Sequence, residues 1–545
     1  MKTRTYFTES LSGVTKVCST AVALGILASG YVTAEEMQAP ADIAAIRKAF
    51  LESAKQKKVL RIGLVDCVLY ALRKNSDIRI ARVEPKIKSD DVRIAQSEFE
   101  PTLNAEYNLH DKTTESTNVF FPVDSKIRDI NFDADISGKL PLGTEYDLSF
   151  LNERYRSNAD IDTINPYFSV EPIVTITQPL LRGFGMTVNL ADVHIARNNH
   201  KQSQEQFRRV VIDSISQAKT AYYNLYSTRD GYAIAEMFRK LAQDLLEINK
   251  ARYAKGLVSS VDVLETEAAA AEREKTLLSA EEAMKRAEDD LKLVLNLGED
   301  PELWNAQVEL LDKLELAVEK PDLIKSINDA FVNRPDYQAR LIDLKNRDIK
   351  IKVKRNALFP TLDAMGSLGM NGIDGTYASA LNKVNKNFID WSVGGKLTVP
   401  WGKGDRARFD QAKLEKARAI LDLQKLEQDI IFAVRDKVRD VDIQFRQERA
   451  SRVSMEKEKM NYAAQTERYA AGHVSTHDML DYQEKLSRAE FDHTKALVDY
   501  DIALVNLDRE TGLTLIKNNV KIEEQYNDAK KQVAISSTPA VSVPW

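Results

Sequence analysis

Two aspartates near the end of the chain, Asp478 and Asp481, are the residues whose type and spacing most clearly indicate chemistry. They stand three positions apart, so a helix would place both carboxylates on one face, and Asp262 occupies the matching position of an earlier, similar segment. Acids gathered around a narrow aperture would bind cations and hinder anions. The alternative is that these aspartates cap or begin helices, where an acid is favoured by roughly 0.3 to 1 kcal/mol, and both roles can hold together.

No group of residues predicts catalysis or a resident cofactor. Of the six histidines only His473 and His477 stand close together, four positions apart across a glycine turn, and a third ligand is missing. We therefore expect a solvated segment there and no metal site. The Gly-Phe-Gly at 183–185 and the Gly-Lys-Gly at 402–404 are shorter than a phosphate-binding loop and fit strand-to-helix turns. The protein is predicted not to be an enzyme.

The composition limits the class of protein. The chain has 545 residues, of which 29% are charged, and its 77 basic and 82 acidic residues are mixed along the sequence for a net charge of -5. Because no basic block occurs, nucleic acid is not expected as a partner. A mean hydropathy of -0.37 argues against a membrane protein made of apolar helices, whereas membrane strands, which alternate, would barely register.

Residues 1–34 have the features of a secretory signal peptide. Lys2, Arg4 and Lys16 precede an apolar, small-residue stretch at 17–29, and Val-Thr-Ala at 32–34 fits a cleavage site. The stretch is shorter than the roughly 20 residues that span a bilayer, which favours cleavage over an uncleaved anchor. Removal of Cys18 with this segment would leave Cys67, which lies on the apolar side of a short helix and is expected to be structural and inert.

The sequence contains an internal duplication. ALRKNSD at 71–77 and FEPTL at 99–103 return, at the same spacing, as AFVNRPD at 330–336 and LFPTL at 358–362. The longest echo is RYAKGLVSSVDVL at 252–264, which returns as RYAAGHVSTHDML at 468–480. Each half is therefore predicted to contain a short helix, a β segment, a long helix, a tip and a return helix.

The β segments, at about 101–179 and 360–400, alternate with period two. In the second one Val393, Gly395, Leu397 and Val399 alternate with polar or small residues, which predicts one apolar face and one wet face. A soluble antiparallel sheet would show the same alternation. The first segment is longer and holds an additional strand-like pair at 130–151. This pair either extends an external loop or adds two strands to the sheet.

The helices carry coiled-coil stripes. Apolar residues from Phe207 to Leu225 and from Ile234 to Ile248 step by three and four. A helix over 187–254 would span about 100 Å, and so would one over 405–470. Each of the two is matched in length by a return helix and a short helix stacked end to end, 259–297 with 77–99 and 475–511 with 336–358. A cylinder about 100 Å tall is expected.

The two halves give the predicted domain organisation. The first repeat covers 77–297, with its tip at about 252–264, and the second covers 336–511, with its tip at about 468–481. Three remaining segments fall where the short helices meet, and they are expected to form an equatorial belt at mid-height. These segments are 35–76, 298–335 and 512–545.

Together these motifs resemble the TolC family of outer-membrane efflux and secretion ducts. The resemblance covers about residues 60–515, and its most specific part is the doubled Arg-Tyr-Ala-x-Gly-x-Val-Ser-x-x-Asp-x-Leu at the tips. Pro-Thr-Leu at 101–103 and 360–362 and Gln-Pro-Leu-Leu at 178–181 agree with it. The resemblance implies a trimer with a helical barrel through the periplasm and one antiparallel β-barrel in the outer membrane. The pair at 130–151 puts the family pattern of twelve strands in doubt.

The resemblance also implies site residues and partners. The inner constriction would be formed by Asp478 and Asp481, with Asp262 as their counterpart. A periplasmic adaptor protein would dock on the tips, although packing between helices explains the two tyrosines equally well. The docking residues implied are Arg252, Tyr253, Gly256, Ser259, Arg468, Tyr469, Gly472 and Ser475.

The leading functional prediction is a passive exit duct in the outer membrane of a Gram-negative bacterium, extending into the periplasm. It would serve a tripartite efflux or type I secretion system driven by an inner-membrane pump or ABC exporter. The alternative is a periplasmic adaptor or a structural coiled-coil protein without a pore. The strands with one apolar face favour the duct.

Overall fold

The computed structural model describes residues 59–115, 124–158, 163–314, 316, 318–385, 387–523 and 541–544. The expected signal peptide lies outside the described residues, and so does the belt segment 35–76 up to residue 58. Two compact units are present: Met1–Leu60 with Gly298–Glu309, and Arg61–Leu297 with Leu310–Trp545. Within the smaller unit, short helices follow the end of the first repeat. They are η1 (Leu297–Glu299) and α9 (Pro301–Trp304), and the strands β1 (Val59–Ile62) and β6 (Gln307–Leu310) pair with each other.

The larger unit contains both predicted repeats. In the first, the short helix expected at 77–99 begins at Ser76, where the Asn75 side chain caps it by accepting from the backbone N–H of Ile78, and it is divided in two at Arg82. The elements are α3 (Leu64–Lys74), α4 (Ser76–Ala81), α5 (Val83–Ser97), β2 (Thr102–Thr114), β3 (Ser125–Lys139), β4 (Glu145–Ser157), β5 (Tyr167–Pro179), α6 (Met186–Asn189), α7 (Ala191–Ala254) and α8 (Ser260–Val294).

The second repeat follows the same order with fewer strands. Its elements are α10 (Leu323–Asn333), α11 (Pro335–Asn356), β7 (Thr361–Met370), β8 (Gly372–Asp374), α12 (Tyr377–Lys383), β9 (Ile389–Thr398), α13 (Gly404–Ala470) and α14 (Thr476–Thr511). The chain then forms α15 (Thr514–Lys517), β10 (Val520–Glu523) and β11 (Val541–Pro544). The short helix α12 has no counterpart in the sequence analysis.

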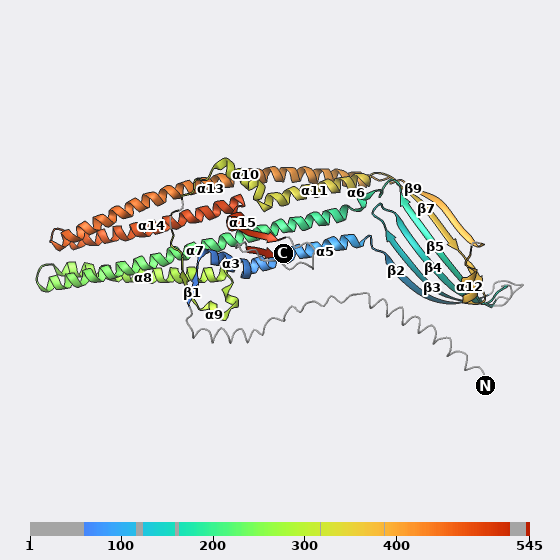
Figure 1. Ribbon diagram of the computed structural model, residues 1–545, viewed down its shortest axis with the longest axis horizontal. Coiled ribbons are helices and arrows are strands. Elements are labelled where there is room, and N and C mark those ends of the chain that lie inside the picture. Colours follow the sequence, from blue (N-terminus) through green and yellow to red (C-terminus); the bar gives the residue numbers. More distant parts are fainter. Residues whose placement is uncertain are drawn as a thin grey trace, which may run out of the picture. The chain divides into compact units, whose positions relative to one another are not determined.

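Two long helical hairpins, α7 with α8 and α13 with α14, dominate this unit (Figure 1). The 64 residues of α7 and the 67 of α13 make each helix about 100 Å long, as predicted. The hairpins meet where α7 packs on α14, and α5 and α11 continue the lines of α8 and α14 towards the sheet. Of the described helices, none is sufficiently long and apolar to cross a membrane.

Equivalent corners join the return helix to the short helix in each repeat. In the first, the Asn75 side chain donates to the carbonyl oxygen of Val294 at 2.9 Å. In the second, Arg334 donates to the Glu510 carboxylate at 2.6 Å, and the left-handed φ of +73° at Gly512 turns the chain away from the helix. The duplication seen in the sequence is therefore also a duplication of contacts.

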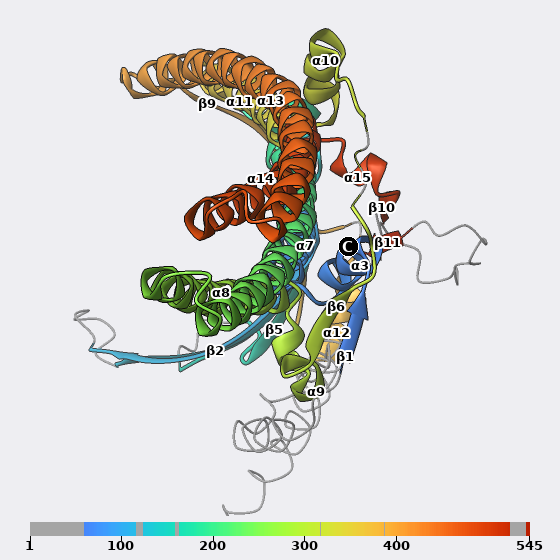
Figure 2. The ribbon, with the colours of Figure 1, turned by 90° about the vertical axis from the view of Figure 1, so that its left-hand side faces the viewer.

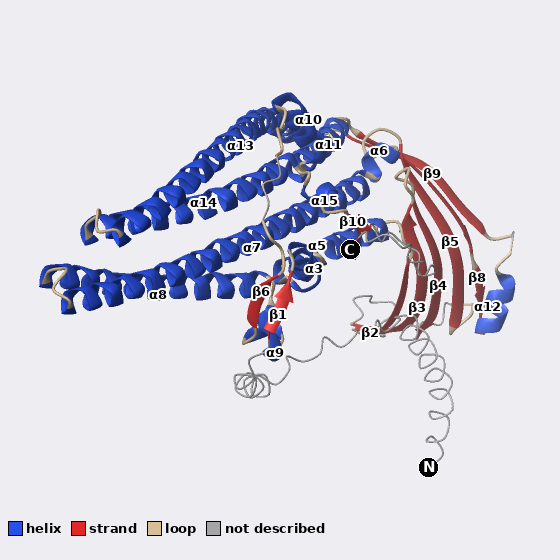
Figure 3. Ribbon diagram, turned by 60° about the vertical axis from the view of Figure 1, so that its left-hand side comes forward, coloured by secondary structure: helices blue, strands red, loops and turns tan. Residues whose placement is uncertain are grey.

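One antiparallel sheet stands at one end of the hairpins (Figure 3). Its strand order is β2-β3-β4-β5-β7-β9, and β8 pairs with β5 beside β7. The additional pair predicted at 130–151 corresponds to β3 and β4, and both are integral strands of the sheet. Of the two alternatives left open by the sequence, the added strands are the ones that the structure contains.

A hydrophobic core joins α7 to the equatorial elements. Phe207, Val211 and Ile215 of α7 pack with Val68 of α3 and Leu515 of α15. Viewed from the tips, these equatorial elements lie on one side of α7, and α8 and α14 lie on the other (Figure 2). Cys67 is fully buried beside this core, and burial, with Asp66 and Asp312 nearby, raises the pKa of its thiol to about 12.

Candidate functional site

Both hairpin tips use the same helix-ending turn. After α7, the N–H of Gly256 donates to Tyr253 O at 2.8 Å and the N–H of Leu257 donates to Arg252 O at 3.0 Å. After α13, Gly472 and the residue that follows it repeat both bonds. The two glycines have φ of +74° and +78°, which a residue with a Cβ rarely adopts. The tight turns explain why both tips carry glycine at the same position.

Two of the three predicted gate acids, Asp262 and Asp478, take part in capping the return helices, whose N-caps are Ser259 and Ser475. Ser259 and Asp262 form a capping box, in which the Ser259 N–H donates to the Asp262 carboxylate at 2.8 Å. The hydroxyl of Ser475 likewise donates to Asp478 at 2.7 Å and accepts from its N–H at 3.1 Å. The hydrogen bonds from Ser259 hold the pKa of Asp262 below its usual range. The capping role proposed from the sequence is therefore real.

Capping leaves the acids available for a second role. Asp478 is exposed, and Asp481, one turn further along α14, is half exposed and pairs with Lys485 at 2.7 Å. An exposed ion pair of this kind contributes little to stability, because water screens it. Both carboxylates lie in the first two turns of one helix. A ring of such acids needs further copies of the chain, and the constriction therefore stays a prediction.

A buried polar contact joins the two hairpins at their tips, and sequence reasoning missed its central residue, Asn249. The Tyr469 hydroxyl donates to Asn249 Oδ1 at 2.8 Å, and Thr476 Oγ1 lies 3.4 Å from the same oxygen. The Arg252 guanidinium lies 4.5 Å from the centre of the Tyr469 ring and donates to the Tyr469 carbonyl. The sequence feature that could have revealed this contact is the presence of an asparagine, Asn249, within the apolar stripe of α7.

The predicted docking residues separate into two groups. Tyr469 is only 6% exposed, so it packs between helices and is not available for docking. Its repeat equivalent Tyr253 is 51% exposed. Arg252 is half-buried because it covers Tyr469. The other predicted residues lie exposed at the two tips and remain candidates for docking: Gly256, Ser259, Arg468, Gly472 and Ser475.

Replacing Tyr469 by phenylalanine should loosen the tips. The change removes the bond to Asn249, whose buried Nδ2 already has no partner among the described residues, and a buried amide left unpaired costs about 1 to 3 kcal/mol. We expect amide hydrogen exchange at 245–254 and 466–480 to rise by about tenfold. Exchange is measured on the monomeric chain, in which Tyr253 is exposed, so Tyr253→Phe at this equivalent position is the control and should leave exchange unchanged. Equal effects in the two variants would contradict the contact.

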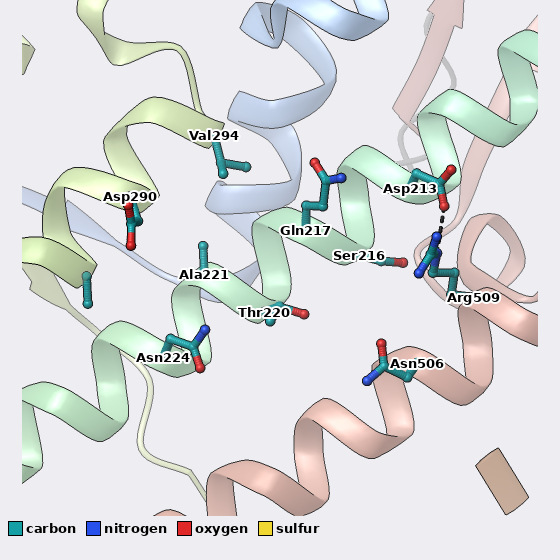
Figure 4. A pocket seen from close by; sticks show the side chains of 11 residues that line it. Asp213, Ser216, Gln217, Thr220, Ala221, Asn224, Asp290, Val294, Asn506 and Arg509 are labelled. Carbon is teal, nitrogen blue, oxygen red and sulfur yellow. Dashed lines mark hydrogen bonds and ion pairs between the residues drawn. The ribbon is translucent and has the colours of Figure 1, made fainter. Parts of the chain in front are cut away.

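Further up the hairpins, a groove of about 320 Å³ runs between α8 and α14 over the face of α7 that is turned away from the equatorial core (Figure 4). Arg509 donates to Asp213 across it at 2.6 Å, joining the two hairpins. The buried Ser216 hydroxyl has no partner among the described residues. The rest of its lining combines amide and hydroxyl side chains with one acid and three apolar residues: Gln217, Thr220, Ala221, Asn224, Ala287, Asp290, Val294 and Asn506.

Where α7 meets α14 there is also a carboxyl group that forms no ion pair with any cation of the described residues. Asp501 is 8% exposed, and burial raises its pKa to about 6. Tyr223 of α7 faces it, and Asp312 lies near Tyr223. The two lysines of this region lie beside Asp508 instead. Lys517 pairs with Asp508 at 2.8 Å, and Lys219 also lies near Asp508.

Asp501 should make the stability of the protein depend on pH. In the folded protein its pKa of about 6 lies above the ordinary value of about 3.9, so the folded state binds this proton more tightly than the unfolded state. The free energy of unfolding is therefore higher at low pH, and it falls as pH rises through 6. Asp501→Asn should remove this dependence and raise the free energy of unfolding at pH 8 by about 3 kcal/mol. Chemical unfolding at pH 5 and pH 8 measures the free energy of unfolding at each pH. Asp492→Asn, which changes an exposed aspartate, is the control. An unchanged pH profile in Asp501→Asn would contradict the assignment.

The sheet has two contrasting faces, as the period-two pattern predicted. A continuous exposed apolar row crosses all six strands of its path and consists of Leu103, Ile136, Leu148, Val174, Leu368 and Trp391. The opposite face is wet and mostly acidic. Its charged residues include Glu106, Asp129, Asp133, Asp135, Asp147, Glu153, Glu171, Asp363, Asp390 and Lys396. An exposed apolar face of this size suits a membrane.

The tip histidines are exposed and do not form a metal site with the acids. Among the described residues, no group of three or more His, Cys, Asp or Glu side chains is arranged to hold a metal ion. His473 belongs to the turn after α13, where its N–H donates to Arg468 O at 2.9 Å. The chemistry that remains is that of surfaces: an apolar sheet face, an acidic sheet face and polar hairpin tips.

Long helical hairpins attached to an antiparallel sheet with an exposed apolar face define an outer-membrane channel protein with a periplasmic helical part. The chain belongs to the outer membrane efflux protein family, whose model matches residues 69–297 and 326–513. The resemblance to the TolC family is thereby confirmed, and membership of an outer membrane efflux protein family agrees with the prediction that the protein is not an enzyme. Family membership also rejects the alternative of a periplasmic adaptor or a structural coiled coil.

Solved structures and curated relatives agree with this family. The Campylobacter jejuni CmeC outer membrane channel has a TM-score of 0.62 at 17% identity, over 82% of this chain and 85% of that one. The outer membrane protein VceC of Vibrio cholerae has a TM-score of 0.60 at 13% identity, and the match covers 82% of this chain and 96% of that one. At these identities the likeness concerns the fold.

The relatives are similar over shorter stretches. Toxin and drug export protein A of Aggregatibacter actinomycetemcomitans is 26% identical over 234 residues, 41% of this chain and 48% of the relative. Nodulation protein T of Rhizobium leguminosarum bv. trifolii is 22% identical over 330 residues, 57% of this chain and 67% of the relative. The match therefore spans about half the length of the first of these relatives.

Proposed function

We propose that three copies of this chain form one passive exit duct, part of a tripartite efflux or type I secretion system. The observation that carries the proposal is the sheet, whose exposed apolar row faces one way and whose acidic face the other. A closed ring of such sheets places the apolar rows against lipid and the acids around water. The hairpins then continue the duct through the periplasm.

The edges of the chain support closure into a ring. At one edge, α4, α5 and α8 expose apolar residues at helical spacing, including Ile80, Ile87, Val261 and Leu264. At the other edge, α13 does the same, and its exposed apolar residues include Leu414, Leu421, Phe432, Val453 and Met460. In the described sheet, β2 and β9 each have one unpaired side. Joining unlike edges head to tail closes a ring and leaves no strand edge open.

The internal duplication indicates how the tips would meet. Within one copy, Tyr469 of the second hairpin reaches Asn249 of the first at 2.8 Å. The repeat equivalent of Asn249 is Gln465, so the exposed Tyr253 of one copy would reach Gln465 of the next. The same contact would then recur around the ring, between hairpins of one copy and of neighbouring copies. This explains why Tyr253 is exposed in a single chain.

The tips would form the gate and the docking surface. Copies of Asp478 and Asp481 around the axis would make a negatively charged constriction, with Asp262 beside it. A periplasmic adaptor protein would bind the exposed tip residues around Gly256 and Gly472, and an inner-membrane pump or ABC exporter would supply the energy. The relative described as a toxin and drug export protein supports an export role.

Fractionation tests the proposal. Outer-membrane extracts should contain the protein as a band at three times the chain mass on an unheated detergent gel, and heating should convert it to the monomer. Recovery only as a periplasmic monomer would reject the channel. Crosslinkers placed at Lys255→Cys and Ala471→Cys, the exposed positions just before the two turn glycines, should capture a periplasmic adaptor. Capture only from Leu278→Cys, halfway along α8, would move the docking surface away from the tips.

A further inference from the structure

The strands β3 and β4 distinguish this chain from the twelve-stranded pattern that the family resemblance implies. Each copy would have to supply four strands to that pattern, but the path from β2 to β9 contains six. The added pair is fully integrated. β2 pairs with β3 along its whole length, from Thr102 opposite Ser137 to Thr114 opposite Ser125, and β4 pairs with β5 from Glu145 to Tyr155.

The turn between β3 and β4 is built into the junction of sheet and helices. The Leu140 N–H donates to Thr144 O at 2.7 Å, and the Gly185 N–H donates to Leu142 O at 3.0 Å. Gly143 has φ of +94°, and a Cβ at this position would come within 2.7 Å of the Asn189 side chain. The turn is therefore packed against the start of α6, at the level where β5 leads into the helices.

The added strands also carry the two faces of the sheet without interruption. Ile136 of β3 and Leu148 of β4 are direct partners, and they link Leu103 of β2 to Val174 of β5 in the apolar row. Asp135 and Ser149 form the neighbouring pair on the wet face. A hairpin lying outside the membrane would have no reason to keep this register.

We propose that the outer-membrane barrel of the assembly contains all six strands of the path from each copy, eighteen in total. This rests on the trimeric channel proposed above. Barrel diameter grows roughly linearly with strand number, so the lumen would be about 1.5 times as wide as that of a twelve-stranded barrel. Barrels of this size enclose an aqueous channel. With its acidic lining, this one would pass large hydrated solutes, cations in preference to anions, and the tips would be the narrowest point.

Cysteine accessibility tests the wall directly. In trimers carrying Cys67→Ser, we expect Asp135→Cys and Ser149→Cys to react with a membrane-impermeant, water-soluble thiol reagent added from outside the cell. Ile136→Cys and Leu148→Cys should resist that reagent and react with a lipid-soluble maleimide. Equal reaction of all four with the water-soluble reagent would place the hairpin outside the membrane and overturn the proposal, even though the trimer forms.

Polymer exclusion measures the width. In planar bilayers, poly(ethylene glycol) of graded size is added on the extracellular side to the wild type and to a variant lacking residues 125–157, in which β2 can pair with β5. The wild type should admit polymers with a radius about 1.5 times larger. An identical cut-off in both proteins would overturn the proposal. Absence of any trimer in the wild type would instead reject the proposed channel itself. If only the deletion variant fails to assemble, the cysteine accessibility experiment decides whether β3 and β4 belong to the barrel wall.

Discussion

Val393→Arg is expected to remove most of the protein from the outer membrane. Val393 lies in the middle of β9, on the apolar face, and is among the most exposed apolar residues of the sheet. An arginine on the lipid face near the bilayer centre costs about 2 to 4 kcal/mol, and a trimer carries three. Trimer yield on unheated gels of outer-membrane fractions should fall by at least tenfold.

Two substitutions on the same strand control this result. Ser392→Arg places the charge on the wet face and should assemble at nearly the wild-type yield. Leu397→Arg lies next to Thr398, the last residue of β9, where the cost near the interface is about 0 to 1 kcal/mol, and should be intermediate. A wild-type yield for Val393→Arg, or an equal loss for Ser392→Arg, would show that the face assignment is wrong.

Removing the charges of Asp478 and Asp481 together is expected to abolish block of the channel by divalent cations. Like charges crowded into a narrow aperture repel one another unless cations relieve them, so a ring of these acids should bind divalent ions and lower conductance. In planar bilayers, the divalent concentration needed for half-block on the periplasmic side should rise about tenfold or more in the double variant.

Asparagine is the substitution that separates the gate from the cap. Ser475 is the N-cap of α14, and its hydroxyl donates to the Asp478 carboxylate. Asparagine keeps an oxygen acceptor for this hydroxyl while losing the charge. Asp478→Asn with Asp481→Asn should therefore lose cation block and keep trimer stability. Asp262→Asn measures the cap of α8 by itself. An unchanged block in the double variant would mean that Asp478 serves only at the helix cap, that Asp481 is only a surface acid, and that the constriction lies elsewhere.

The sequence was sufficient for the long helices because their stripes repeat over many turns. The helix expected at 405–470 is Gly404–Ala470, and the strand faces agree with the period-two pattern. The pattern did not indicate depth in the membrane, since alternation reports a face and not the distance from a strand end. Leu397 was therefore recognised as apolar-facing, although it lies at the end of β9 next to the helical junction.

Contacts between hairpins were beyond the sequence for a different reason. The repeat makes Tyr253 and Tyr469 look equivalent, but only Tyr469 has a neighbouring hairpin in the same chain, and this makes one residue exposed and the other buried. Asn249 went unnoticed because a single polar residue in an apolar stripe is usually tolerated at a surface. Its importance follows from the Tyr469 hydroxyl, which arrives from a helix more than 200 positions away.

Covalent closure of the ring tests the central claim most directly. Asn108 of β2 and Ser392 of β9 both lie on the wet face, six residues from the helical end of their strands. With Cys67→Ser, a chain carrying Asn108→Cys and Ser392→Cys is treated with a short bis-maleimide in outer membranes. The account predicts linked dimers and trimers and nothing larger, and only monomers from either single variant. Monomers alone from the double variant, or a ladder that continues beyond three copies, would contradict a closed trimeric channel.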